Sequence, residues 1–433
     1  MLVRSTYGNP VPDRQSDPHR TPPKQTMTAA IPPARVLAGM LANSTEILAH
    51  ELVNPTLRSP DWSDAQWRVA RAVSAMHGIS GLLAGRLRWR DAPSTWCTFL
   101  ADQWEQTATR QRRLDEILQT VDCDARERGI PLLTMKGSAL RRLGLYAPGE
   151  RPMADLDLLA RHRDVDRAAS MLRSLGFREG PVTTRDRTFE PTQTQAPAPL
   201  GECATNSVKI ELHWSATGKL PLREVDATEI VFPETSVSGL QGYPSRAALM
   251  LHLILHTAEN MVVRSLRLLQ LHDIAHLSAH LTELDWEEVL RLSCITGENA
   301  WWIYPPLALT ERYVAPVPLF VLRQARAGCP RLLVNECRRK RLTDLSRSHP
   351  WLAPFPAIRW ARSVPEAVRY VSGRLFHNEL SATRKVAFDA NPILANSDWM
   401  RLSRAHRVIR WMSGRVPRVA TLASVEAAFA DPH

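Results

Sequence analysis

The spacing of apolar residues along this chain follows two periods, and each period predicts one kind of secondary structure. In the N-terminal part, apolar residues recur at helical spacing, which indicates helices over residues 28–58 and 63–89 and a long amphipathic helix that ends at Gly129. Ser63 or Asp64 is the expected N-cap of the second helix, because a short polar side chain there accepts a hydrogen bond from the first turn. No catalytic or metal-binding pattern occurs in this part of the sequence.

Between residues 129 and 235 the spacing changes to short apolar or alternating segments, which predict strands. Three segments share this pattern: 130–135 (IPLLTM), 154–160 (ADLDLLA) and 208–214 (VKIELHW). A helix that ends at Gly176 is expected between the second and third of them, and the stretch from Pro181 to Asn206, rich in Pro, Thr and Gln, is typical of a surface loop. From about residue 245 to about 345 the helical spacing returns.

The strand over residues 154–160 carries two acids among leucines. Asp155 and Asp157 face the same side, because side chains of a strand alternate. Two carboxylates this close repel each other unless a cation or proton lies between them, and unpaired buried acids are costly. We therefore expect them to ligate Mg²⁺, which prefers oxygen ligands, rather than to be solvated acids at a sheet edge. Glu211, in the later strand, would join them or would lie in an ordinary half-exposed strand.

The turn into the helix after the first strand is suited to a phosphate group. Gly137 lets the backbone approach a bulky ligand, and Ser138 with the following N–H groups opens the helix. Lys136 would contact a triphosphate, or would only end the preceding strand. Arg151 would hold a phosphate through two hydrogen bonds, or would pair with Glu150 or an Asp.

Several histidines of the helical region share helix faces, as zinc ligands often do: His252 and His256, and His272, His276 and His280. The Leu-rich surroundings and the lack of an HExxH motif favour core or interface histidines instead. Asp273 is expected to pair with Arg267 or a neighbouring histidine, or else to help orient the nucleotide site. His213 is expected to be packed or hydrogen-bonded rather than catalytic.

The composition limits the class of protein. The net charge of +11 comes mostly from scattered Arg, including a basic run over residues 401–418, so a generally basic surface is favoured over a dedicated nucleic-acid site. No window approaches about 20 uninterrupted apolar residues, and residues 1–27 are polar and Pro-rich without an apolar signal segment. The six cysteines form no CxxC pair. We therefore expect a cytoplasmic protein with reduced thiols, no membrane span and a disordered tail over residues 1–27.

Rival chemistries lack their motifs. The sequence contains no GxxxxGK[ST], no GxGxxG and no GxSxG, so a P-loop, a dinucleotide-binding fold and a hydrolase elbow are not indicated.

The ordered set of motifs resembles a known family. MKGSAL, ADLDLL and IELHW are similar to the Gly-Ser, acid-x-acid and single-acid motifs of the DNA polymerase β-like nucleotidyltransferase superfamily. The closer resemblance is to the bacterial uncharacterised nucleotidyltransferases, and it rests on these residues: 136–140, Arg151, 155–159, 172–177 and 211–214. It continues into LHLILHTAEN and RSLRLLQLHDIAHL and covers roughly residues 110–320. The third acid here is Glu211, where that group more often has Asp.

This resemblance implies an α+β fold, in which a small mixed β-sheet nucleotidyltransferase core is embedded in a mostly helical protein. The core is expected over residues 129–235, after an N-terminal helical region over 28–128. A helical domain over 236–345 would close over the nucleotide site, and a basic helical region over 346–433 would follow.

The resemblance also implies a metal-dependent reaction that moves NMP from an NTP to a hydroxyl-bearing acceptor and releases pyrophosphate. In it, Asp155, Asp157 and Glu211 act in catalysis and ligate Mg²⁺ (or Mn²⁺), and the nucleotide is bound by Lys136, Gly137, Ser138 and Arg151. A small molecule, a peptide or protein, and an RNA end all stay open as acceptors. The alternative is a catalytically silent module that uses the same fold to bind a nucleotide, a nucleic acid or a protein.

Overall fold

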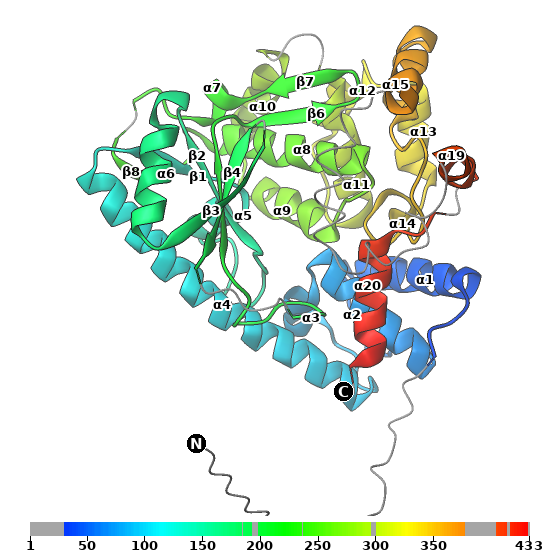
Figure 1. The fold of residues 1–433 in the computed structure, drawn as a ribbon. Helices are drawn as coiled ribbons and strands as arrows, with labels where there is room; N and C mark the ends of the chain where they lie inside the picture. Colours follow the sequence, from blue (N-terminus) through cyan, green and yellow to red (C-terminus); the bar gives the residue numbers. More distant parts are fainter. Residues whose placement is uncertain are drawn as a thin grey trace, which may run out of the picture.

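A six-stranded mixed sheet surrounded by helices forms the centre of the molecule in the computed structural model (Figure 1). The structure describes these residues: 30–183, 185–192, 198–235, 237–295, 300–376, 404–413 and 416–431. The expected tail over residues 1–27 and part of the basic run over 401–418 lie outside the described residues. The expected α+β fold, with a small sheet in a mostly helical protein, is confirmed.

The N-terminal helices follow local sequence signals. They are α1 (Ala34–Val53), α2 (Asp64–His77), α3 (Ser80–Arg86) and α4 (Ser94–Glu127). Ser63 is the N-cap of α2, and its side chain accepts a hydrogen bond from the backbone N–H of Gln66 at 3.3 Å. Gly78 follows α2 in the left-handed conformation, with φ at 68°, which a residue without Cβ adopts freely. The helix expected over residues 63–89 is therefore divided into α2 and α3.

The sheet brings together strands that are far apart in the sequence. Its strands, in the order β3-β4-β5-β2-β1-β8, are β3 (Phe177–Val182), β4 (Asp186–Pro191), β5 (Lys209–His213), β2 (Asp155–Ala160), β1 (Pro131–Thr134) and β8 (Gly239–Gln241). β2 runs parallel to β5 and antiparallel to β1. The register of β2 and β5 pairs Asp155 with Lys209 and Asp157 with Glu211. The expected strands β1, β2 and β5 are therefore three neighbours at the centre of the sheet.

The prediction of a surface loop from Pro181 to Asn206 is wrong for the first part of this stretch. The segment Asp186–Pro191 is β4, which lies antiparallel to β5 in the sheet. The sequence of β4 lacks the alternating apolar pattern of a strand, because Phe189 is the one large apolar residue of β4 that is fully buried. Pairing with strands on both sides, which local sequence does not encode, determines this element.

Helices cover both faces of the sheet. α4 and α6 (Val165–Ser174) pack on one face, against the apolar side chains of β2 and β5: Leu156, Leu158, Ile210 and Leu212. On the other side of the sheet lie α5 (Lys136–Arg142), α8 (Arg246–Val262) and α9 (Leu268–Ser278) (Figure 1). Because strand side chains alternate, the acids of β2 and β5 face this second side.

The other elements extend the helical part. They are η1 (His162–Asp164), β6 (Thr217–Leu220), β7 (Arg223–Asp226), α7 (Thr228–Val231), α10 (Glu283–Ile295), η2 (Trp301–Ile303), α11 (Tyr304–Tyr313), α12 (Leu319–Arg326), α13 (Arg331–Arg339), α14 (Leu342–Leu345), η3 (Ile358–Trp360), α15 (Val364–Phe376), α19 (Arg404–Met412) and α20 (Val419–Ala430). α20 lies against α2 (Figure 1), and one buried apolar cluster extends from Leu37 to Phe429. The division into five regions stays a prediction, and the sheet itself extends past residue 235 into β8.

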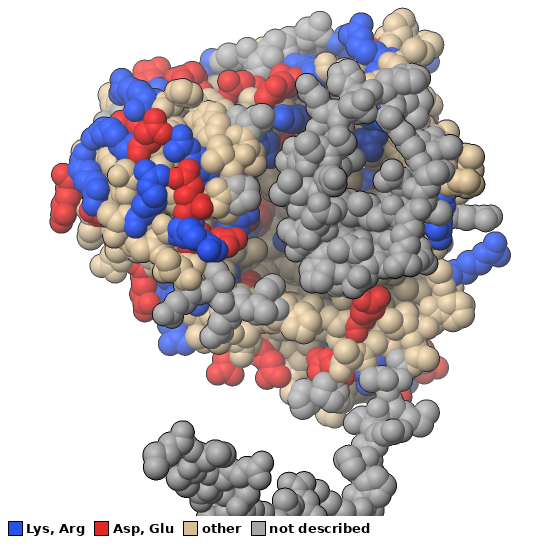
Figure 2. Space-filling view, viewed as in Figure 1, with Lys and Arg blue, Asp and Glu red and all other residues tan. Residues whose placement is uncertain are grey.

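Charges of both signs are mixed on the face seen in Figure 2. On its left side, Lys and Arg alternate with Asp and Glu. Among the ion pairs of exposed acids is that of Arg187 with Asp166 at 2.7 Å. Isolated surface pairs of this kind contribute little to stability. Among the helices that the structure describes, none has the length and apolar character needed to cross a membrane.

Candidate active site

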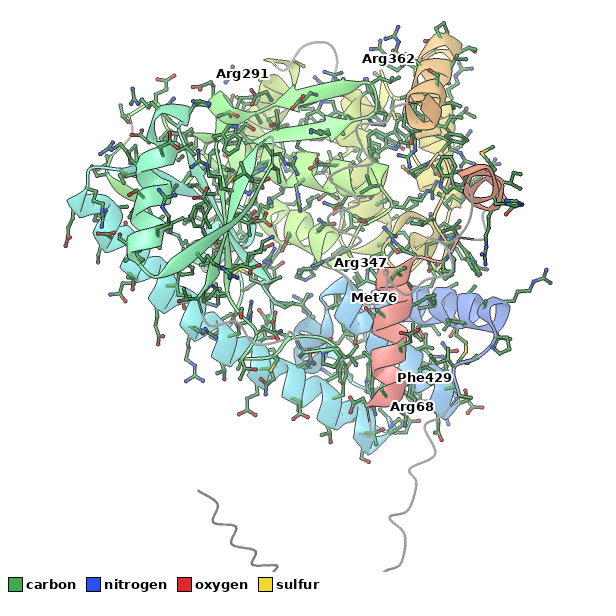
Figure 3. The ribbon with its side chains drawn as sticks, viewed as in Figure 1. Arg68, Met76, Arg291, Arg347, Arg362 and Phe429 are labelled. Atoms are coloured by element: carbon green, nitrogen blue, oxygen red, sulfur yellow. The ribbon has the colours of Figure 1, made fainter. Side chains whose placement is uncertain are left out.

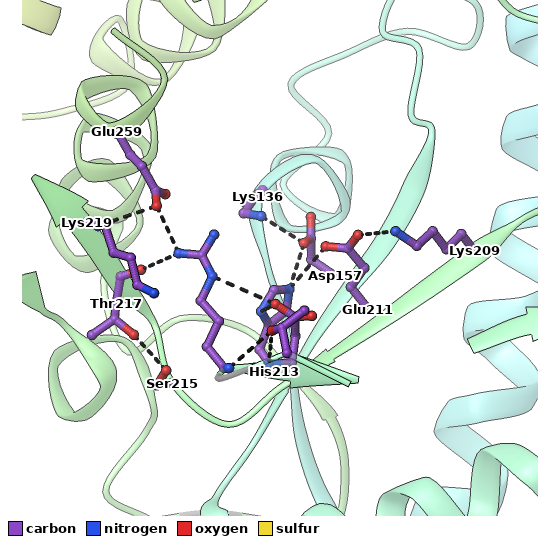
Figure 4. Close-up of polar contacts among 12 residues, drawn as sticks. Lys136, Asp157, Lys209, Glu211, His213, Ser215, Thr217, Lys219 and Glu259 are labelled. Atoms are coloured by element: carbon purple, nitrogen blue, oxygen red, sulfur yellow. Dashed lines mark hydrogen bonds and ion pairs between the residues drawn. The ribbon is translucent and has the colours of Figure 1, made fainter. Parts of the chain in front are cut away.

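Three side chains from β2 and β5 meet on the polar face of the sheet. A ligand atom from each of Asp157, Glu211 and His213 lies within 4.8 Å of the others (Figure 4). Nε2 of His213 donates a hydrogen bond to Oδ1 of Asp157 at 3.0 Å and lies 3.6 Å from Oε2 of Glu211. The parallel register explains this meeting, because Asp157 lies directly beside Glu211, and His213 follows two residues later on the same face.

Lys136 supplies a positive charge beside Asp157. It begins α5 with φ at 49°, a left-handed conformation that costs a non-glycine residue about 1 kcal/mol. Its Nζ lies 2.8 Å from Oδ1 of Asp157 (Figure 4). Although burial favours a neutral carboxyl, Lys136 and the His213 hydrogen bond hold the pKa of Asp157 well below its ordinary value. These contacts therefore favour the ionised form of the buried Asp157 carboxyl.

Asp155 lies two residues before Asp157 on the same face, outside the group of three. It is half-buried, and burial and the neighbouring charges of Asp157 and Glu211 raise the pKa of its carboxyl to about 6. Glu211 also contacts Nζ of Lys209 at 2.5 Å. The two neighbouring acids oppose the ionisation of Asp155, which indicates an excess of negative charge at this site. This donor set fits a hard divalent cation, for which carboxylate oxygens are the usual ligands.

Arg151 lies between the turn at α5 and helix α9. Its Nε and Nη2 donate to the two carboxylate oxygens of Asp273 at 2.8 and 2.7 Å, and the hydroxyl of Tyr146 donates to the same acid. The expected pairing of Asp273 with Arg267 or a histidine is therefore replaced by a pairing with Arg151 and Tyr146. In this arrangement Arg151 links the loop before β2 to the helical part.

Gly137 leaves room for the Arg151 guanidinium. A Cβ built on Gly137 would lie 2.1 Å from Nη1 of Arg151 and 2.9 Å from Sδ of Met153. The absence of a side chain at this position thus has a packing reason inside the protein. Ser138 follows in the first turn of α5 and is buried. Contacts of Lys136, Gly137, Ser138 and Arg151 with a nucleotide stay predictions.

The histidines of the helical part are held by hydrogen bonds. Nδ1 of His272 bonds the hydroxyl of Tyr146 at 2.8 Å, His252 bonds Tyr243, and His276 bonds the carbonyl oxygen of Leu145. Within the described residues, no group of three metal-ligating side chains includes any of them. His213, which the sequence suggested was only packed or hydrogen-bonded, lies in such a group. The signal was its position two residues after Glu211 in the alternating strand.

The fold and this site define a class: an α+β protein with an acidic, cation-suited cluster on a mixed sheet, beside a lysine that begins a short helix. A family model described as "Uncharacterised nucleotidyltransferase" matches residues 63–297, more than half of the chain, and the chain belongs to this family. No curated protein matches the sequence. Membership places the chain among nucleotidyltransferases and implies an NTP as a substrate.

Proposed function

We propose that this protein is a metal-dependent nucleotidyltransferase of the polymerase β-like type. It would transfer NMP from an NTP to the hydroxyl of an acceptor. In this reaction the acceptor oxygen forms a bond to the α-phosphorus, the bond from that phosphorus to the bridging oxygen breaks, and pyrophosphate leaves. The observation that carries the proposal is the meeting of Asp157 and Glu211 on adjacent parallel strands, beside Lys136.

Asp155, Asp157 and Glu211 are the residues that would hold Mg²⁺ or Mn²⁺. When bound, such an ion would neutralise charge on the triphosphate and on the leaving pyrophosphate. The excess negative charge at Asp155 supports this assignment, because two nearby carboxylates oppose its ionisation in the protein alone. His213 donates to Asp157 and thereby fixes the orientation of that carboxylate.

The remaining residues would position the substrates. Lys136, with Gly137 and Ser138 in the first turn of α5, would hold the triphosphate, and Lys136 carries a positive charge at the site. Glu211 would ligate the metal or accept the proton of the acceptor hydroxyl. Positioning and charge neutralisation would supply most of the rate enhancement.

A pyrophosphate-release assay tests the proposal. The full-length protein is incubated with the four NTPs, Mg²⁺ or Mn²⁺ and a cell extract that supplies acceptors. We expect pyrophosphate release with transfer of label from the NTP, abolished by EDTA. We expect Glu211→Gln to lower the rate about a hundredfold or more, because an amide keeps the shape of the side chain and loses its charge.

Glu287→Gln is the matched control, because Glu287 is exposed on α10, which carries none of the site residues. This variant should keep the wild-type rate, and both variants should unfold at the wild-type temperature. Equal rates for Glu211→Gln and wild type would contradict the assignment of this acid. Nucleotide binding without pyrophosphate release would support the catalytically silent module instead.

A further inference from the structure

A cavity of about 690 Å³ opens beside the acidic cluster. Its lining includes Ala154 and Lys209, at the start of β2 and β5, and thus reaches the register position of Asp155. Its other walls come from α2, α3 and α4, from residues 198–207 and from the C-terminal part of the chain. A volume of this size is typical of a small-molecule site, for which about 300–1,000 Å³ is usual.

Two arginines, Arg267 and Arg347, both line this cavity. They are brought together by backbone pairing, because Leu266 and Ser346, the residues before them, form a parallel β-bridge. The backbone N–H of Arg347 also donates to the carbonyl oxygen of Leu266 at 3.0 Å. Figure 3 shows Arg347 beside Met76, another residue of the cavity wall, near one end of α20.

A buried histidine fixes both segments that carry the arginines. Nδ1 of His77 accepts a hydrogen bond from the backbone N–H of Leu268 at 2.9 Å, and Nε2 of His77 lies 3.1 Å from Oγ of Ser348. Leu268 directly follows Arg267 in the sequence, and Ser348 directly follows Arg347. Since Nδ1 accepts, the ring proton lies on Nε2, and the histidine is neutral. A neutral linker holds the two arginines near each other without supplying a counter-charge.

Among the described residues, the charges around the cavity leave this pair without a direct ion pair, although Glu190 also lines the cavity and the charges of Asp155 and Glu202 act on Arg267. Arg110 forms an ion pair with Glu202 at 3.0 Å, and Lys209 forms one with Glu211. In the described part of the chain, neither Arg267 nor Arg347 has an ion pair with a carboxylate. Burial and the charge of Arg267 lower the pKa of Arg347 to about 10. An anion between the two guanidinium groups would remove this repulsion.

From this geometry we propose that Arg267 and Arg347 bind a phosphate group of a substrate in this cavity. Paired guanidinium groups suit phosphate, whose oxygens accept several charged hydrogen bonds at once. The identity of the ligand rests on the proposed function, since the phosphate would belong to the NTP or to a phosphorylated acceptor. Arg347 lies outside the family match, so this pocket depends on a part of the chain that the family model does not cover.

Calorimetric titration of the full-length protein with inorganic phosphate, in EDTA, tests the pocket without any reaction. We expect Arg347→Gln and Arg267→Gln each to weaken phosphate binding about tenfold or more, because each removes a charged hydrogen-bond donor. Arg291→Gln is the control, because Arg291 is exposed on α10 and lies far from Arg347 in Figure 3. This control should bind phosphate as the wild type does. Thermal unfolding shows whether each variant is folded. If Arg347→Gln does not fold, the phosphate affinity of Arg267→Gln is compared with that of the wild type instead.

A second titration distinguishes the two sources of the phosphate. The same measurement is repeated with a saturating non-hydrolysable NTP analogue and Mg²⁺. Loss of phosphate binding supports a pocket for the nucleotide, and simultaneous binding supports a pocket for a phosphorylated acceptor. If no analogue binds but Arg347-dependent phosphate binding persists, the proposed nucleotidyl transfer fails and the anion pocket stands. A wild-type protein that binds no phosphate, or arginine variants with wild-type affinity, would overturn the inference.

Discussion

At the scale of single residues, Gly137 shows how one missing side chain supports the site. The Arg151 guanidinium occupies the space where a Cβ would lie, with Nη1 at 2.1 Å, and its Nε and Nη2 are bonded to Asp273. Arg151 therefore has little freedom to move away. We expect Gly137→Ala to lower the free energy of unfolding by about 2 kcal/mol, the usual cost of overpacking a filled space. Denaturant unfolding followed by circular dichroism measures this difference.

Gly39→Ala is the matched control for this substitution. Gly39 lies in α1, and a Cβ there would meet no atom within 4 Å. Alanine is the better helix former, so this variant should be more stable than the wild type by about 0.5–1 kcal/mol. If Gly137→Ala behaved like Gly39→Ala, the packing role of Arg151 would be wrong.

At the scale of elements, His77 joins the end of α2 to the first residue of α9 and to the segment after α14. Burial and the charges of Arg267 and Arg347 lower the pKa of His77 to about 3, from an ordinary value of 6.5. The unfolded chain therefore takes up a proton between these values, whereas the folded protein does not. Stability is full above pH 6.5 and falls as the pH decreases toward 3.

The expected loss from His77 is about 2 kcal/mol of unfolding free energy between pH 7 and pH 5. Denaturant unfolding at both pH values measures it. In His77→Gln the drop over this interval should be smaller by about this amount, because glutamine does not titrate. His50→Gln, at a side chain that is 59% exposed, is the control for replacing a histidine by glutamine. An unchanged drop in His77→Gln would show that this histidine does not contribute to it.

At the scale of the whole molecule, the two ends of the described chain are packed together. α20 lies on α2, and Phe429 is buried in the main apolar cluster. Arg68 of α2 donates to the carbonyl oxygens of Ala428 and Asp431, at 3.2 and 2.7 Å, at the end of α20 (Figure 3). Because α20 also contributes Ser424 to the cavity wall, this packing shapes the proposed phosphate pocket.

We expect Phe429→Ala to lower the free energy of unfolding by about 3 kcal/mol, as removal of a buried aromatic ring usually does. Phe320→Ala, at a residue of α12 that is 36% exposed, should change it by less than about 1 kcal/mol. Thermal and denaturant unfolding of the full-length variants compare the two. Equal losses would mean that α20 contributes little to the stability of the common core.

Local sequence determined the elements whose pattern is strong. The cap at Ser63, the helix end at Gly129, and the strands β1, β2 and β5 follow from short-range signals that need no distant partner. The spacing of two residues between Asp155 and Asp157 also predicted that both acids lie on one face of their strand. These features depend on residues within a few positions of one another, and such interactions can be read along the chain.

Tertiary structure decided the partners. Pairing on both sides made a strand of β4 despite its charges, and the parallel register of β2 and β5 brought His213 to Asp157 and Glu211. Arg151 pairs with Asp273, which is 122 residues away in the sequence. The β-bridge between Leu266 and Ser346 brings the backbone of Arg267 close to that of Arg347. Such contacts form because folding buries whole faces at once. Their energy belongs to surfaces that meet only in the folded chain, and no local pattern of residues encodes which surfaces those are.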